Sequence, residues 1–251
     1  MNSFIKKRCW QQDLNKRESI IGIIQACLVM VSIAIVFYRA LIAVPFLIPV
    51  GMIYFKSYRS ELMAKKQRLY RSEFKDMIQL LSSNLSVGYG ITNAFVEVER
   101  ELRATTKKET RMVKELGIII RQLNMNLSVE AALMTFANRV KLEDAFSFVT
   151  VFVSAGRSGG NLVDIISDTT MQIVEKQEVE KEIETILTAK KYEFRVMSMI
   201  PFFIIGYMSV SFGNFMSPLY GNILGIGVMT LCLVIYIFAY ALGLKIVTIE
   251  I

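Results

Sequence analysis

The sequence predicts an all-α membrane protein in which two transmembrane helix pairs flank a cytoplasmic six-helix bundle. Three observations lead to this fold class. The chain is 53% hydrophobic, and its long charge-poor blocks lie near both ends. Most charged residues lie between these blocks, and the same middle region repeats apolar residues at helical spacing. We therefore divide the 251 residues into a cytoplasmic tail (1–18), a transmembrane hairpin (19–55), a cytoplasmic helical domain (56–195), a second transmembrane hairpin (196–244) and a cytoplasmic tail (245–251).

The first apolar block contains one charged residue, Arg39. A helix needs about 20 apolar residues to cross a bilayer, so the block is too long for one span. It predicts helices over 19–38 and 40–55 with Arg39 at the turn. Two prolines in the second helix leave open whether it crosses fully. The block is too long for a cleaved signal peptide and lacks a clear small-residue cleavage site.

The second block predicts spans over 196–216 and 223–244, separated by the turn sequence SPLYGN (217–222). The cations near the four predicted spans lie almost entirely on one side, and only Arg39 lies on the other. The positive-inside rule therefore places both termini and the central domain in the cytoplasm. The cations on that side are Lys6, Lys7, Arg8, Lys16, Arg17, Lys56, Arg59, Lys65, Lys66, Arg68, Lys190, Lys191, Arg195 and Lys245.

The central domain carries six apolar stripes at spacings of three and four residues, which predict six amphipathic helices packed as a bundle. The sixth continues towards the third span. The stripes are Tyr70, Phe74, Met77, Leu81 and Leu85; Ile91, Phe95, Val98 and Leu102; Met112, Leu116, Ile119 and Leu123; Val129, Leu133, Phe136 and Val140; Ala145, Val149 and Phe152; and Leu162, Ile166, Thr169 and Ile173.

Two corners between these helices repeat at an offset of 126 − 88 = 38 residues, GYGITNAF and NLSVEAAL. Gly88 aligns with Asn126, and both residue types favour a left-handed helix end. Gly90 aligns with Ser128, which is expected to cap the following helix.

A third corner, SAGRSGGNLVDII, raises the possibility of a phosphate-binding loop. Such a loop needs the pattern GxxxxGK[ST] after a strand. Here Asn161 follows Gly160, no lysine is near, and the preceding segment reads as helix. We interpret Gly156, Gly159 and Gly160 as a structural corner that leads into the helix beginning at Leu162.

The residue content disfavours enzymatic and metal chemistry. The chain has no histidine, and its three cysteines show no CxxC spacing. We expect no catalytic residue, no cofactor and no metal ligand set, although metal binding to the acidic surface is left open. The net charge of +7 arises beside the apolar blocks, which favours membrane topology over nucleic-acid binding.

The order of these segments resembles the type II secretion F-domain family. An apolar pair, a helical domain, the Ser158–Leu162 corner, a charged helix, the run TAKKYEFRVMSMIPFFI and a second apolar pair follow one another. The arrangement is similar to the inner-membrane platform proteins of tight-adherence (Flp) pili, of TadB or TadC type. The resemblance covers nearly the whole chain, which carries one F domain, whereas classical type II secretion platforms carry two.

The resemblance implies a non-enzymatic platform protein in the bacterial inner membrane. It implies that a hexameric secretion ATPase engages the cytoplasmic domain, and that pilin or pseudopilin subunits are extracted into a fibre. A single F domain implies a paralogous F-domain partner or self-association. The corner residues Gly156, Gly159, Gly160, Leu162, Gly88, Gly90 and Ser128 would then serve packing and coupling.

Two segments of the sequence each have two possible interpretations. Glu175, Glu178, Glu180, Glu182 and Glu184 form either an ATPase-docking face or a solvated helix face neutralised by Lys176 and Lys181. The stretch from Arg103 to Arg111 is either a solvated loop or a lipid-contacting one. For the whole chain, the alternative functions are a permease-like subunit driven by a separate ATPase, or a membrane scaffold or receptor.

Overall fold

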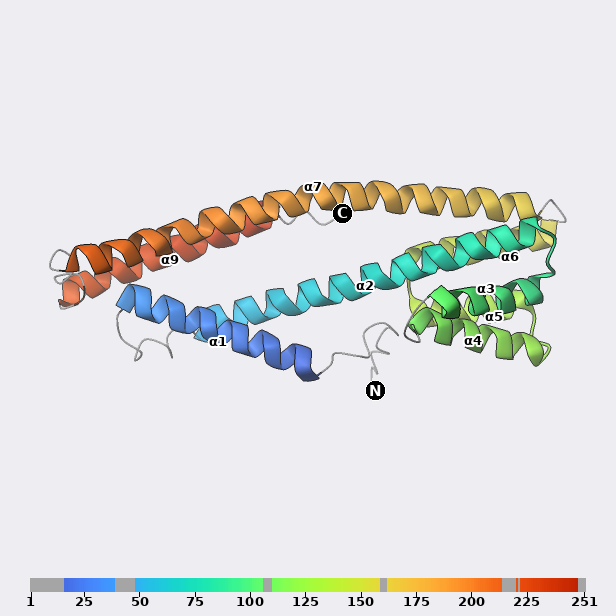
Figure 1. The fold of residues 1–251 in the computed structure, drawn as a ribbon, viewed down its shortest axis with the longest axis horizontal. Helices are drawn as coiled ribbons and strands as arrows, with labels where there is room; N and C mark the ends of the chain where they lie inside the picture. The colour runs from blue at the N-terminus through green and yellow to red at the C-terminus, as the bar shows by residue number, and fades with distance from the viewer. Residues whose placement is uncertain are drawn as a thin grey trace, which may run out of the picture. The chain divides into compact units, whose positions relative to one another are not determined.

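The computed structural model describes residues 16–38, 48–105, 110–158, 162–213, 220 and 222–247, and every regular element in these ranges is helical (Figure 1). The all-α class is therefore confirmed. The helices are α1 (Lys16–Tyr38), α2 (Ile48–Ser86), α3 (Ile91–Thr105), α4 (Arg111–Asn124), α5 (Val129–Val140), α6 (Glu143–Ser158), α7 (Leu162–Ser211) and α9 (Ile223–Val247).

The chain forms two compact units. Among the described residues, unit 1 lies within Glu61–Glu178, and unit 2 lies within Asn15–Ser60 and Val179–Ile251. Both unit boundaries fall inside long helices, α2 and α7, so each of these helices contributes residues to both units.

The first predicted hairpin is only partly covered by the structure. Helix α1 includes the predicted segment 19–38, whereas Arg39 and residues 40–47 lie outside the described residues. Residues 48–55 open α2, which continues without interruption to Ser86. Pro49 lies in the first turn, where its missing N–H has no helical partner to lose, so it does not interrupt α2.

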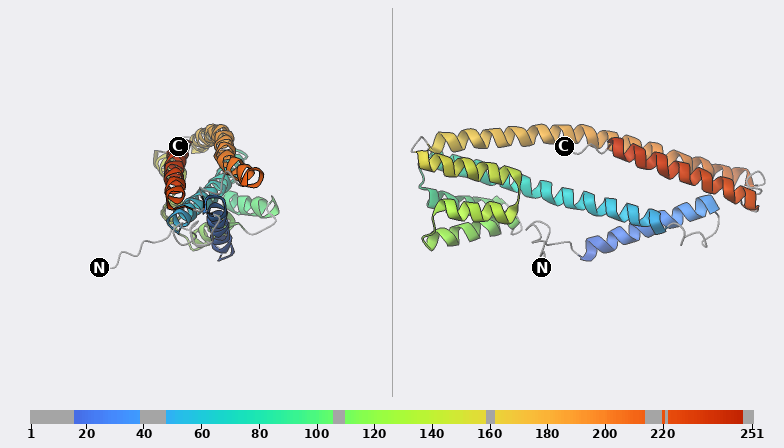
Figure 2. Two further views of the ribbon diagram at one scale, coloured as in Figure 1. Left: turned by 90° about the vertical axis from the view of Figure 1, so that its left-hand side faces the viewer. Right: turned by 180° about the vertical axis from the view of Figure 1, so that it is seen from behind.

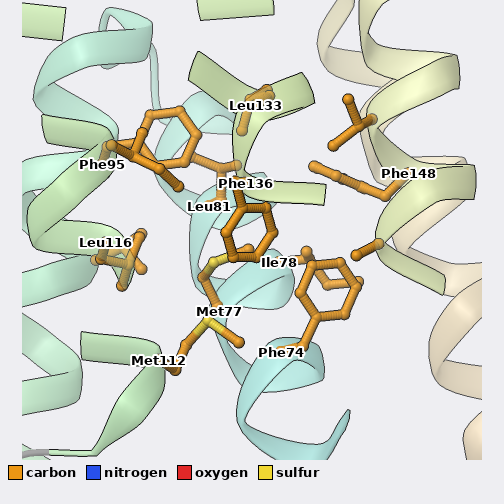
Figure 3. Close-up of a cluster of buried hydrophobic side chains, with 14 of the residues drawn as sticks. Phe74, Met77, Ile78, Leu81, Phe95, Met112, Leu116, Leu133, Phe136 and Phe148 are labelled. Atoms are coloured by element: carbon orange, nitrogen blue, oxygen red, sulfur yellow. The ribbon is translucent and has the colours of Figure 1, made fainter. Parts of the chain in front are cut away.

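Unit 1 has one hydrophobic core, to which helices α2 to α7 all contribute. Phe74 is a fully buried member of this core (Figure 3). Its ring stacks on Phe136 at a centroid distance of 6.2 Å and meets Phe148 edge-on at 6.1 Å. Each of the six predicted apolar stripes supplies buried side chains to this core, because residues three and four apart share one face of a helix.

Helix ends in unit 1 use local polar groups. Thr110 caps α4, and its hydroxyl accepts a hydrogen bond from the Val113 N–H. At the other end of α5, Lys141 adopts a left-handed conformation with φ of 55° and donates its N–H to the Ala137 carbonyl at 2.8 Å. The predicted loop from Arg103 to Arg111 is shorter than expected, because α3 extends to Thr105 and α4 begins at Arg111.

Unit 2 packs its helices through glycines. A Cβ on Gly22 would lie 2.7 Å from the Tyr58 ring, and one on Gly51 would lie 2.6 Å from Met30 Sδ. These contacts bring α1 against α2, and the Phe194 ring lies against Gly243 to bring α7 against α9. Small residues at such positions are typical of helix packing in membranes, where backbones approach closely.

Two helices are long and apolar enough to cross a membrane: one window within Leu162–Ser211 and the segment Leu224–Ile246. Hardly any residue of either window is buried, unlike the core helix of a soluble protein. These helices include most of the second predicted pair of spans, 196–216 and 223–244, of which residues 214–216 lie outside the described residues. The apolar part of α1, Ile20–Ala34, is shorter, so the first predicted pair stays a prediction.

Candidate functional site

The most concentrated polar cluster in the described part of unit 1 surrounds Asp144, in the first turn of α6. Its side chain is 2% exposed. Arg71 on α2 donates to Oδ2 from Nε at 3.0 Å and from a terminal guanidinium nitrogen at 2.9 Å. From α7, Lys176 Nζ donates to Oδ1 at 3.1 Å and Gln177 Nε2 donates to Oδ2 at 3.1 Å. One carboxylate therefore joins three helices.

The Asp144 cluster holds its carboxylate in the charged form. Burial by itself raises the pKa of Asp144, because it disfavours the charged form. The hydrogen bonds and positive charges of Arg71 and Lys176 outweigh burial, and the pKa is lowered from its ordinary value of 3.8. At neutral pH the cluster thus carries one negative and two positive charges.

A second carboxylate, the half-buried Glu73, lies two residues after Arg71 on α2. Its Oε2 accepts the N–H of Met112 at 3.4 Å, and the Thr110 side chain also hydrogen-bonds to it. The carboxylate therefore lies at the N-terminus of α4, where the helix dipole favours negative charge. Burial raises the pKa of Glu73 despite these hydrogen bonds. Asp144 and Glu73 together tie α2 to the starts of α6 and α4.

The two repeated corners have the same backbone geometry. Gly88 and Asn126 both adopt the left-handed conformation, with φ of 98° and 60°. The Tyr89 N–H bonds to the Asn84 carbonyl at 3.1 Å, and the Leu127 N–H bonds to the Gln122 carbonyl at 3.1 Å. These bonds, with Gly88 to Leu85 and Asn126 to Leu123, define a Schellman helix end at each corner. The left-handed helix ends expected from the sequence are confirmed.

The residue that follows each left-handed turn opens the next helix differently. Ser128 caps α5, and its Oγ accepts the Ala131 N–H at 3.2 Å, as the sequence predicts. Gly90 has no side chain to cap α3, and a Cβ there would meet nothing within 4 Å. Close packing does not require glycine at this position.

The corners also expose apolar side chains, which sequence reasoning missed. The repeat places two at each corner, Val87 and Tyr89 in the first and Met125 and Leu127 in the second, and all four are exposed. Each pair differs by the same 38-residue offset as the corner itself. The apolar stripes predict buried positions and do not indicate exposed apolar residues. The alignment of the two corners could have identified these four positions.

The third predicted corner is only partly visible. Gly156 lies inside α6 with nothing within 4 Å of a Cβ placed there, so it does not form the turn itself. Gly159 and Gly160 lie outside the described residues. Leu162 begins α7 and packs, half-buried, against the core of unit 1.

The five glutamates of α7 do not share one face. Glu175, Glu178 and Glu182 are exposed and follow one another at spacings of three and four residues, which places them on one side of the helix. Glu180 and Glu184 are half-buried and lie on the opposite side. Lys176, one expected neutralising partner, instead bonds to Asp144. Exposed Asp168 extends the first side, because it lies seven residues before Glu175.

The described residues offer little that suggests ligand chemistry. One open hollow, of about 510 Å³, is lined by Ser128, Glu130, Ala131, Met134 and Val153. No group of three Cys, Asp or Glu side chains in the described ranges is placed to hold a metal ion. The polar clusters instead connect helices to one another.

Comparison with known proteins identifies one family. The family model described as "Type II secretion system (T2SS), protein F" matches residues 77–210, which include most of unit 1 and the part of α7 that contains the first candidate span. No curated protein and no solved structure matches the chain.

Proposed function

Because the chain belongs to the type II secretion system protein F family, we propose that it is a platform component of a pilus or type II secretion machine. In this proposal it lies in the bacterial inner membrane with unit 1 in the cytoplasm. A hexameric secretion ATPase engages unit 1, and the membrane helices help to extract pilin or pseudopilin subunits. The machine is of the tight-adherence type, and a paralogous F-domain chain or a second copy completes the platform.

One observation carries this proposal. Helix α7 contributes Ile166 and Ile173 to the core of unit 1 and also contains a candidate membrane span. The same helix supplies Lys176 and Gln177 to Asp144. A force applied to the helices of unit 1 would therefore act on an element that continues into the apolar segment.

Topology is the first test. In a background with Cys9, Cys27 and Cys232 replaced by Ser, single cysteines are placed at two exposed positions, Asn138 in α5 and Asn222 before α9. We expect a membrane-impermeant thiol reagent to label Asn222→Cys in intact spheroplasts and to label Asn138→Cys only after lysis. Labelling of Asn138→Cys from outside would refute the proposal.

ATPase engagement is the second test. We propose that the acidic side of α7 in unit 1, Asp168, Glu175 and Glu178, docks a cationic face of the ATPase. The variant E175K/E178K should lose at least 10-fold in ATPase co-purification, because two attractive charges become repulsive. The control E61K/D76K reverses two exposed carboxylates on α2 and should retain wild-type recovery. Equal recovery from both variants would remove this surface from the proposal.

The chain itself is proposed to be non-enzymatic. It has no histidine and no GxxxxGK[ST] sequence, so it lacks the usual general base and the phosphate-binding loop. We expect the purified protein to show no ATP hydrolysis above the rate of buffer alone, measured as released phosphate.

A further inference from the structure

Several cations of unit 2 have no carboxylate partner. Lys190, by contrast, pairs with Glu193 at 2.9 Å. Five other cations of unit 2 lie next to apolar helix segments. No carboxylate of the described residues lies within ion-pair distance of these five. They are Lys56 and Arg59 on α2, Lys191 and Arg195 on α7, and Lys245 on α9.

The packing of unit 2 brings these cations to one end of its apolar helices. Phe194 lies against Gly243, so Arg195 and Lys245 lie at the same end of the α7–α9 pair. Helix α1 runs opposite to α9 (Figure 2), and its Ile33 packs with Met229 near the start of α9. The beginning of α1 therefore lies towards the Lys245 end.

Helix α2 joins the same end through α1. Tyr58 packs on Gly22 in the first half of α1, so the neighbouring residues Lys56 and Arg59 also lie at the Lys245 end. In contrast, the described parts of α1 beyond residue 19, of α7 beyond Arg195 and of α9 before Lys245 contain no charged residue.

The surroundings of these cations match a boundary between hydrocarbon and water. Arg195 lies over the ring of exposed Tyr192, with its guanidinium carbon 5.7 Å from the ring centroid. On the apolar side of Arg195, Val196, Met197 and Met199 are exposed. Tyrosine with a cation at the end of an exposed apolar helix is typical of the headgroup level of a membrane.

We propose that Lys56, Arg59, Lys191, Arg195 and Lys245 form a cationic girdle that binds the headgroups of anionic phospholipids. The girdle rests on the membrane location in the proposed function. Each headgroup phosphate supplies the negative charge that no carboxylate of the described residues brings within ion-pair distance of these cations. Cations near an anionic membrane surface each contribute about 1 kcal/mol of attraction. The girdle thereby fixes the depth at which unit 2 sits in the bilayer.

The test measures lipid preference on the full chain in a neutral detergent. Native mass spectrometry records binding of phosphatidylglycerol and of phosphatidylcholine to the wild type, to K191Q/R195Q/K245Q and to the control K75Q/K114Q/K141Q. The control removes the same charge from unit 1. We expect the wild type and the control to prefer phosphatidylglycerol. The girdle variant should lose about 100-fold of this preference, as three lost attractions of about 1 kcal/mol imply.

Either of two results would overturn the girdle: equal binding of both lipids by the wild type, or an unchanged preference in K191Q/R195Q/K245Q. The second would assign the cations to another acidic partner, such as a protein surface. Flotation with phosphatidylcholine vesicles separates this outcome from failure of the proposed function. A chain that does not insert contradicts the membrane location itself, whereas insertion without lipid preference contradicts the girdle alone.

Discussion

In unit 1 the ring of Phe74 is fully buried, whereas in unit 2 the ring of Phe203 is 74% exposed. Charge shows a similar contrast. Arg71 and Arg139 in unit 1 pair with the buried carboxylates of Asp144 and Glu115, at 2.9 and 2.8 Å. Lys191 and Arg195 in unit 2 have no carboxylate partner among the described residues. Unit 1 buries a large apolar core and pairs these two arginines inside it, whereas unit 2 leaves Phe203 and these two cations on its surface.

This difference indicates which surroundings each unit is built for. Exposed apolar area of this kind costs free energy in water, and large patches mark contact with another apolar phase. Unpaired cations beside that area need a negative surface rather than a low-dielectric interior. The surface of unit 2 fits a bilayer with charged headgroups, while the core of unit 1 fits a domain surrounded by water.

The largest expected effect tests the apolar side of the comparison. Phe74→Ala removes a ring that contacts Phe136 and Phe148, and should lower the free energy of unfolding of unit 1 by about 3–5 kcal/mol. Phe203→Ala removes the same atoms from an exposed position and should change the free energy of unfolding of unit 2 by less than about 0.5 kcal/mol. Urea unfolding of the full chain in micelles, monitored by hydrogen exchange of the amides of each unit, measures both. Equal losses would contradict the contrast.

The next effect tests the charged side. Asp144→Ala leaves Arg71 and Lys176 without their carboxylate and should destabilise unit 1 by about 3 kcal/mol. The neighbouring Glu143 is a matched control, because its side chain is 87% exposed and lies 3.9 Å from Lys176. Glu143→Ala should cost under about 0.5 kcal/mol in the same assay. A cost at Glu143 equal to that at Asp144 would show that the buried geometry is irrelevant.

The same cluster predicts a pH dependence with a defined sign. The folded state lowers the pKa of Asp144, so the stabilisation is fully present above the ordinary pKa of 3.8. It is lost as the pH falls from there through the lowered pKa of the folded state. The difference in unfolding free energy between the wild type and Asp144→Asn should therefore shrink as the pH falls below 3.8. A difference that grows on acidification would reverse the assignment.

Much of unit 1 follows from local patterns in the sequence. The apolar stripe from Tyr70 to Leu85 predicts a helix face, and its five residues are buried in the structure. Asn126 favours a left-handed helix end and Ser128 favours a helix N-cap whatever surrounds them, so the second corner could be predicted. The Asp144 cluster could not, because its partner Arg71 is 73 residues away in the chain and only tertiary packing brings the two together.

Unit 2 shows the limits of composition in another way. Hydropathy predicts where apolar helices lie, but it does not show which of their side chains meet. Nothing in the sequence distinguishes Gly243 from the other residues of its apolar run, and only the structure places the Phe194 ring against it. The expectation that the five glutamates of α7 share one face was wrong for a related reason. A count of charges ignores their positions around the helix, which place Glu180 opposite Glu178.

The smallest expected effect concerns what holds α7 against α9. Pro201 lies inside α7 and has no N–H. It therefore cannot donate the usual helical hydrogen bond to the carbonyl four residues earlier, that of Met197. One residue further on, the Ser198 carbonyl accepts the Tyr236 hydroxyl from α9 at 2.7 Å, and the Tyr236 ring meets Phe202 edge-on at 5.3 Å. A neighbouring helix thus provides a donor beside the proline, as helices in membranes allow.

Tyr236→Phe keeps the ring contact and removes only the hydroxyl. Hydrogen bonds between membrane helices contribute about 0.6 kcal/mol on average, so the variant should lower the stability of unit 2 by about that amount and leave unit 1 unchanged. Tyr207→Phe is the control, since Tyr207 is exposed and no hydrogen bond of its hydroxyl is found among the described residues. Hydrogen exchange of the amides near Ser198, compared between the two variants in bilayers, detects the loss. A loss of about 3 kcal/mol would mean that unit 2 depends on a buried polar contact as strongly as unit 1 does, and the contrast between the units would fail.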